Sequence, residues 1–143
     1  MISREKERKM YFIDNGYLQT FYISQNIGKK LENAVAANLF FSDTPLRYFR
    51  NSTEIDFLLE GGIPVQVSYR LSEPVTFERE VKALVNFLEY SGSDVGYIIT
   101  WNEADTIKRD GKTIKILPAW YFLLFGNGPG DADFFNPSPL DGR

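Results

Sequence analysis

The chain has 143 residues, with 16 Lys or Arg against 19 Asp or Glu, which gives a net charge of −3. This charge argues against a strongly basic nucleic-acid-binding surface, because phosphate backbones are normally held by clustered Lys and Arg. The absence of cysteine and histidine excludes disulfides, thiolate metal sites and imidazole ligands. Any bound metal would be held by oxygen atoms, which favours magnesium, manganese or calcium over zinc.

One globular domain is expected, because 43% hydrophobic and 15% aromatic residues are enough to build a core at this length. Residues 1–8 are interpreted as a charged lead-in, residues 9–125 as an α/β domain and residues 126–143 as a flexible tail rich in Gly, Pro and Asp. The sequence contains neither an apolar run of membrane-spanning length nor an apolar signal core. A cytoplasmic protein without a membrane partner is therefore expected.

The first predicted elements are a short apolar run, a helix and a strand. Residues 10–13 (Met-Tyr-Phe-Ile) end at residues 14–16 (Asp-Asn-Gly), where a turn is expected. Apolar residues recur at helical spacing over residues 27–41, which predicts the first core helix. Residues 46–50 are predicted to form a short strand.

A β-hairpin is predicted from two alternating segments on either side of residues 60–62 (Glu-Gly-Gly). In the first segment three apolar side chains are expected on one face: Ile55, Phe57 and Leu59. With glycine in the left-handed conformation in a three-residue loop, Leu59 pairs with Ile63. Asp56 then lies opposite Gln66, and Glu54 lies opposite Ser68. The register predicts a polar quartet on one face of the sheet.

A second helix and a buried strand follow the hairpin. Residues 76–91 carry an apolar stripe, with Thr76 as the expected N-cap and Gly92 as the stop. Residues 95–101 are almost continuously apolar, as expected for a strand that is buried on both faces. Because the helix provides a crossover, this strand is predicted to run parallel to residues 65–69.

The last predicted elements are a hairpin and a short helix. Residues 106–109 and 112–116 flank Asp110 and Gly111, a pair that favours a two-residue turn. Residues 119–125 follow Pro118 and are predicted to be helical. The element order predicts an α/β sandwich with a mixed sheet.

The helix-β-β-β-helix-β order, with one acid in the helix and one on the second strand, resembles the PD-(D/E)XK restriction-endonuclease-like superfamily. More narrowly, the chain resembles the uncharacterised C-terminal domain of many prokaryotic AAA-type P-loop ATPases. Seven short motifs carry this resemblance, within residues 9–124: residues 9–16, 28–39, 54–57, 64–69, 79–84, 98–101 and 116–120. It implies a restriction-endonuclease-like three-layer sandwich, with an AAA-type ATPase module, another protein or DNA as the partner.

The resemblance also implies site residues by position. Glu32 matches the helix acid and Asp56 the second-strand acid, whereas Gln66 and Ser68 stand where the family usually has Asp or Glu and Lys. A hard divalent cation needs two or three carboxylates, and the lysine helps to orient and activate the attacking water. The implied catalytic set is therefore degenerate at Gln66 and Ser68. If Mg²⁺ binds, Glu32, Asp56 and Gln66 are its implied ligands.

Two arginines are candidate phosphate or partner contacts. Arg70 follows on the polar face and could replace the missing lysine electrostatically, although a guanidinium is a poor proton acceptor. Arg79 lies on the second helix, where an exposed polar face is the alternative interpretation.

Each candidate also has a purely structural interpretation. Asp56 could belong to a solvated hairpin face, and Glu32 could be a surface acid at the edge of its helix's apolar stripe. Gln66 and Ser68 could form a buried hydrogen-bonded pair that fixes the strand register.

Two functions are therefore predicted as alternatives. The first is a catalytically degenerate nuclease-like domain that serves as an interaction or DNA-contacting module of an AAA-type ATPase, without enzymatic activity of its own. The alternative is an active Mg²⁺-dependent DNA endonuclease of the PD-(D/E)XK type, with Glu32, Asp56 and Gln66 as ligands and a displaced base. A plain structural domain is the remaining possibility.

Overall fold

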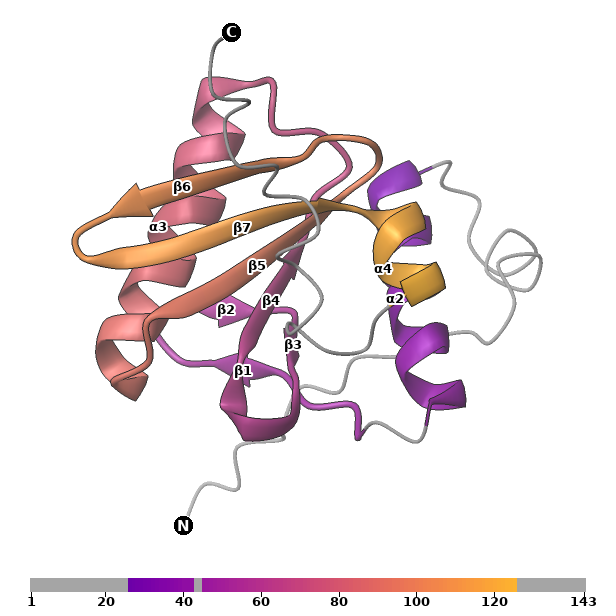
Figure 1. The fold of residues 1–143 in the computed structure, drawn as a ribbon, viewed down its shortest axis with the longest axis horizontal. Helices are drawn as coiled ribbons and strands as arrows, with labels where there is room; N and C mark the ends of the chain where they lie inside the picture. The colour runs from indigo at the N-terminus through magenta and orange to yellow at the C-terminus, as the bar shows by residue number, and fades with distance from the viewer. Residues whose placement is uncertain (1–25, 43–44, 126–143) are drawn as a thin grey trace, which may run out of the picture.

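A computed structural model of the chain describes residues 26–42 and 45–125 (Figure 1). The predicted lead-in, the apolar run at residues 10–13 with its turn, and the predicted tail lie outside the described residues. The elements are α2 (Ile27–Phe41), β1 (Phe49–Arg50), β2 (Glu54–Ile55), β3 (Phe57–Leu58), η1 (Glu60–Gly62), β4 (Pro64–Val67), α3 (Pro74–Ser91), β5 (Val95–Thr100), β6 (Asp105–Arg109), β7 (Lys112–Pro118) and α4 (Ala119–Phe125). Within the described ranges, none of the helices combines the length and hydropathy that a membrane crossing requires.

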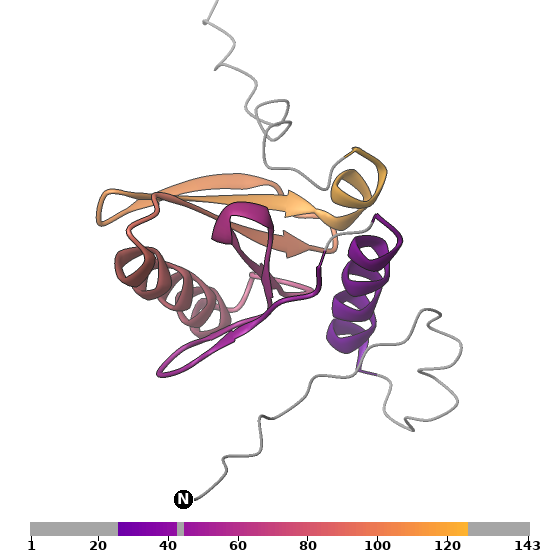
Figure 2. The same cartoon turned by 90° about the horizontal axis from the view of Figure 1, so that it is seen from below.

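The fold is mixed α/β, built on a five-stranded sheet in the order β3-β4-β5-β7-β6. Strands β4, β5 and β7 are parallel, whereas the edge strands β3 and β6 are antiparallel to their neighbours. The predicted parallel pairing is confirmed, with Val65 opposite Tyr97 and Val67 opposite Ile99. Helix α3, which connects β4 to β5, packs on one face of the sheet, and α2 and α4 pack on the other (Figure 2).

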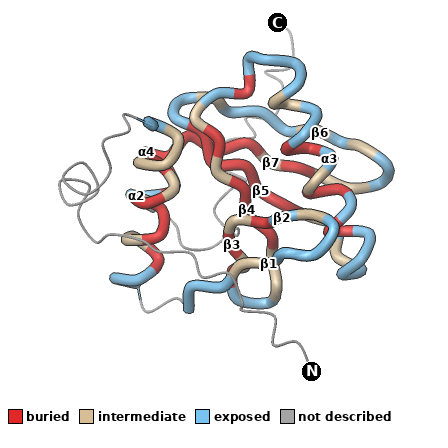
Figure 3. The backbone as a smooth tube through the Cα atoms, turned by 180° about the vertical axis from the view of Figure 1, so that it is seen from behind, coloured by how far each residue is buried: buried red, intermediate tan, exposed pale blue. Residues whose placement is uncertain are grey.

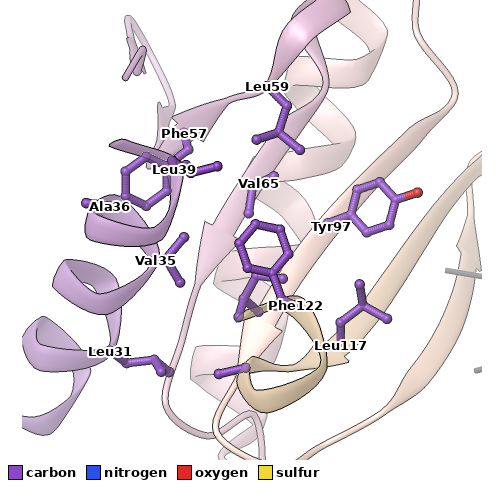
Figure 4. Packing of buried hydrophobic residues seen from close by; sticks show 12 residues of the cluster. Leu31, Val35, Ala36, Leu39, Phe57, Leu59, Val65, Tyr97, Leu117 and Phe122 are labelled. Atoms are coloured by element: carbon purple, nitrogen blue, oxygen red, sulfur yellow. The ribbon is translucent and has the colours of Figure 1, made fainter. Parts of the chain in front are cut away.

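Two hydrophobic clusters fill the space between the sheet and its helices. Leu31 and Val35 of α2 meet Tyr97 of β5 and Phe122 of α4 in the first cluster (Figure 4). Ile98, the residue after Tyr97, packs against α3 in the second cluster. The apolar run of β5 is thereby explained, because alternate side chains enter different clusters and the central strands are buried on both faces (Figure 3).

The two long helices form largely where the periodicity predicts them. Helix α2 has the predicted bounds, and the side chain of Asn26 caps it by accepting a hydrogen bond from the backbone N–H of Lys29 at 3.1 Å. Helix α3 ends at Ser91, and the φ of 72° at the next residue, Gly92, confirms the predicted glycine stop. The predicted N-cap at Thr76 is wrong, because α3 begins at Pro74, whose fixed φ suits the first helical position.

Both predicted tight turns are confirmed. The backbone N–H of Leu59 donates to the carbonyl of Ile63 at 2.9 Å, and the intervening Gly61 and Gly62 have φ values of 78° and 77°. Asp110 and Gly111 also have positive φ, so β6 and β7 form the expected two-residue hairpin.

The first strands depart from the prediction. Only Phe49 and Arg50 of residues 46–50 form a strand, and they pair with β2 in a separate two-stranded sheet. The chain bends at Asp56, so Ile55 joins the cluster under α3, whereas Phe57 joins the cluster under α2. The expectation that Ile55 and Phe57 share a face is therefore wrong, as is the pairing of Glu54 with Ser68, because Glu54 pairs with Arg50.

Candidate functional site

A polar pocket of about 550 Å³ lies beside the bend at Asp56. Its charged and polar lining includes Glu32 of α2, Glu54, Asp56 and Gln66 of the hairpin, and Arg79, Glu80 and Lys82 of α3. The pocket therefore reaches both helical layers around the edge of the sheet. This is possible because β3 is an edge strand.

The Gln66 side chain holds the bend together. It is 4% exposed, its Oε1 accepts the backbone N–H of Asp56 at 2.9 Å, and its Nε2 donates to the carbonyl oxygen of Glu54 at 3.0 Å. The side-chain amide therefore supplies one acceptor and one donor to the main chain, as a neighbouring strand would. It replaces the ladder hydrogen bonds that the bend removes.

The Asp56 carboxylate makes a second link between the two segments. Its Oδ2 accepts the backbone N–H of Val67 at 2.8 Å. Asp56 is half-buried and lines the pocket, so the same side chain stabilises the hairpin and contributes negative charge to the pocket.

Glu32 approaches the pocket from α2. Its side chain is 14% exposed, and its Oε2 lies 3.5 Å from the Nζ of Lys29. Such a long contact with a half-exposed lysine contributes little to stability. The structure thus brings Glu32, Asp56, Gln66 and Arg79 to one pocket.

Ser68 and Arg70 do not line this pocket. The Oγ of Ser68 donates to the backbone carbonyl of Arg70 at 3.1 Å. The guanidinium carbon of Arg70 lies 5.3 Å from the ring centroid of Tyr69. The predicted Gln66–Ser68 pair is therefore wrong, because each side chain bonds main-chain groups instead.

Glu80 is a pocket residue that the sequence interpretation missed. It is 9% exposed, and its Oε1 accepts hydrogen bonds from the Nη2 and Nε of Arg79 at 2.9 and 3.2 Å. Glu80 lies three residues after Phe77 and four before Leu84, on the apolar stripe of α3. An acid at such a position is unusual and was the available signal.

The pocket carries an excess of negative charge. Four carboxylates line it, from Glu32, Glu54, Asp56 and Glu80, whereas the cations are Arg79 and Lys82. A cationic group is therefore favoured in this pocket over a bare phosphate. Over residues 26–42 and 45–125, no group of three or more acids is arranged to hold a metal ion.

Comparisons of the chain with protein-family models, with curated proteins and with solved structures found no match. The functional interpretation is therefore based on the motifs and the pocket themselves.

Proposed function

We propose that this chain is a catalytically degenerate nuclease-like domain that serves as an interaction or DNA-contacting module of an AAA-type ATPase. The observation that carries the proposal is the hydrogen bonding of Gln66, which stands where the resembled family usually has a metal-binding Asp or Glu. Its amide is uncharged, and both ends bond the main chain at 2.9 and 3.0 Å. A residue held in this way serves the backbone, and it lacks the charge with which a carboxylate holds a hard cation.

Ser68, which stands where the resembled family usually has its catalytic lysine, supports the same proposal. Ser68 brings no positive charge, its hydroxyl donates to the carbonyl of Arg70, and it does not line the pocket. A nuclease of the resembled type uses its lysine to orient and activate the attacking water. Loss of a group of this kind typically lowers a rate on the order of a hundredfold or more.

The charge of the pocket bears on the kind of partner. With four carboxylates and two cations around it, the pocket suits a Lys or Arg side chain of a partner protein. Contact with DNA would then fall to the exposed Arg79 and Lys82 at the rim. The family resemblance points to an ATPase module as the protein partner.

The convergence of carboxylates keeps the Mg²⁺-dependent endonuclease as a second candidate. Glu32, Asp56 and Glu80 line one pocket, and their negative charge attracts a divalent cation, although in this structure they are not arranged as a ready-made metal site. This candidate predicts a rise in melting temperature with millimolar Mg²⁺ that Asp56→Asn removes.

Cleavage of a supercoiled plasmid tests the proposal against this candidate. The parent protein and the Asp56→Ala variant are incubated with plasmid in the presence of Mg²⁺ or Mn²⁺, and equal, background nicking by both is expected. Metal-dependent nicking by the parent that Asp56→Ala abolishes would overturn the proposal. A calorimetric titration with each metal tests the site without a guessed substrate.

The salt dependence of binding to duplex DNA distinguishes the two roles in the proposal, contact with DNA and interaction with a protein. If the rim contacts DNA, the double substitution of Arg79 and Lys82 by Gln weakens binding and lowers the slope of log K against log salt. Lys108→Gln is the matched control, because this exposed lysine lies on β6, outside the pocket. If the slope of log K against log salt is unchanged in the double variant, interaction with a protein is favoured.

A further inference from the structure

A second cavity, of about 600 Å³, lies on a different part of the molecule from the polar pocket and shares none of its lining residues. It is lined mainly by apolar side chains: Ile27, Leu31 and Ala34 of α2, Tyr69, Trp101, and Trp120 of α4. We call this cavity the tryptophan groove, because it includes both tryptophans of the chain.

Large apolar side chains are exposed around the tryptophan groove. Trp101 is 57% exposed, Trp120 is 48% exposed and Ile27 is 50% exposed. The rings of Tyr69 and Trp101 lie 5.9 Å apart at an angle of 30°, so they form a broad aromatic wall. A contiguous apolar surface of this kind marks a binding site, because leaving it in water is unfavourable.

The chain itself leads an apolar segment to this groove. Asn26 caps α2, and the next residue, Ile27, lines the groove, so residues 1–25 reach the described structure at its rim. Residues 17–23 are Tyr-Leu-Gln-Thr-Phe-Tyr-Ile, and no charged residue occurs between residues 17 and 25. Such a segment can be buried without the cost of desolvating a charge.

The reach of the segment also fits. Residues 21–23 are separated from Asn26 by a few peptide units, each of which spans at most about 3.6 Å. Leu31 and Ala34 lie one to two helical turns beyond Ile27, roughly 6 to 11 Å along the axis of α2. We infer that residues 17–23 fold back and bury Phe21, Tyr22 or both in the tryptophan groove, an inference independent of the proposed function.

Intrinsic fluorescence of the full chain tests this docking, because both tryptophans report on the groove. In the double variant, Phe21 and Tyr22 are changed to Asp. We expect red-shifted emission and a roughly twofold larger acrylamide quenching constant than in the parent, because the indole rings become more exposed to solvent. The matched control changes Phe134 and Phe135 to Asp in the other terminal segment. Emission and quenching of the control should equal those of the parent. An effect of the control alone, or of neither variant, overturns the inference.

A disulfide trap provides the second measurement, because the chain has no native cysteine. Tyr22→Cys is combined with Ala34→Cys in the groove or, as the control, with Lys29→Cys, which is on α2 but outside the groove. Lys29 is nearer to Tyr22 in sequence, so tethering alone would favour the control pair. We expect an intramolecular disulfide only in the first pair, at micromolar protein and after both variants show the thermal transition of the parent. Equal yields, or disulfides that join two molecules and increase with concentration, contradict docking within the chain.

Discussion

The side-chain oxygen Oε1 of Gln66 accepts the backbone N–H of Asp56 at 2.9 Å, and this bond stands where a strand-to-strand bond is expected. Because the donor end of the same amide bonds the carbonyl of Glu54 at 3.0 Å, the chain can bend without leaving buried polar groups unpaired. The bend turns Ile55 toward α3 and Phe57 toward α2. One buried amide thus shapes both the hydrophobic packing and the polar pocket.

Replacing Gln66 by Ala should destabilise the fold by about 2–4 kcal/mol, because the N–H of Asp56 and the carbonyl of Glu54 lose their buried partners. Ser68→Ala is the matched control, because Ser68 is a buried polar residue directly after β4. It removes one hydrogen bond, to the carbonyl of Arg70, and should cost about 1 kcal/mol. Urea unfolding monitored by circular dichroism measures both. Equal losses for the two variants would contradict the bridging role of Gln66.

Asp56→Ala should cost about 1–2 kcal/mol, whereas Asp56→Asn should cost less, because an amide oxygen can still accept the N–H of Val67. The same urea titration compares the two variants with the parent. This order matters for the plasmid and metal assays, since it makes Asp56→Asn the variant that removes charge with the least structural damage. If Asn destabilised as much as Ala, the charge of Asp56 rather than its acceptor would be the stabilising feature.

The ion pair between α3 and the β6-β7 hairpin should make stability depend on pH. Arg109 donates two hydrogen bonds to Glu78, at 2.7 and 3.1 Å, and these bonds lower the pKa of the Glu78 carboxyl from its usual value. A depressed folded-state pKa stabilises the protein above the unfolded pKa, near 4.3, and this contribution is lost as the pH falls through the folded pKa.

At pH 7 the melting temperature of the parent should therefore be slightly higher than that of the Glu78→Gln variant. The difference is small because the ion pair is exposed. The margin should close as the pH falls below the unfolded pKa and through the lowered folded pKa of Glu78, because the carboxyl then becomes protonated in both states. Calorimetric melting across this range, with the exposed Glu89→Gln on the same helix as the control, measures the effect. A margin that widened toward acid pH would refute this assignment.

Two glycines should respond to substitution for different reasons. A Cβ on Gly96 would lie 3.3 Å from the Cδ2 of Leu84 and 3.3 Å from the Cγ of Pro64, so Gly96→Ala should destabilise by about 1–3 kcal/mol through overpacking. At Gly92, a Cβ meets no atom within 4 Å, but φ is 72°. Gly92→Ala should therefore cost about 1 kcal/mol, and Gly92→Asn less, because Asn tolerates the left-handed region.

Chemical denaturation of four variants, Gly96→Ala, Gly96→Asn, Gly92→Ala and Gly92→Asn, separates the two causes. Asn at position 96 would be worse than Ala because it is larger, whereas Asn at position 92 would be better than Ala. If Ala were more stable than Asn at both positions, space rather than backbone conformation would limit both sites.

Several predictions succeeded because their signals are local. The apolar period of residues 27–41 defined α2, and the glycines at positions 61, 92 and 111 supplied positive φ where the chain turns or stops. The predicted start of α3 is wrong for a local reason too, since the N-cap was expected at Thr76 although Pro74 suits a first helical turn.

The polar residues were harder to place. Glu32 was a candidate only through a family resemblance, whereas the hairpin register also indicated Asp56, and their presence in one pocket depends on how α2 packs beside the sheet edge. The helical pattern marks Glu80 as an acid on the apolar stripe of α3, but its place beside Asp56 and Gln66 in one pocket depends on how α3 packs against the hairpin.

By itself, the amino-acid order determined the sequence of helices and strands, the tight turns and the parallel pairing of β4 with β5. These depend on backbone preferences and on apolar periods that are readable within a short window. Only the tertiary structure decided that β2 leaves the main sheet and that an amide and a carboxylate replace ladder bonds at the bend. Such side-chain to main-chain bonds form only when segments distant in sequence already lie side by side.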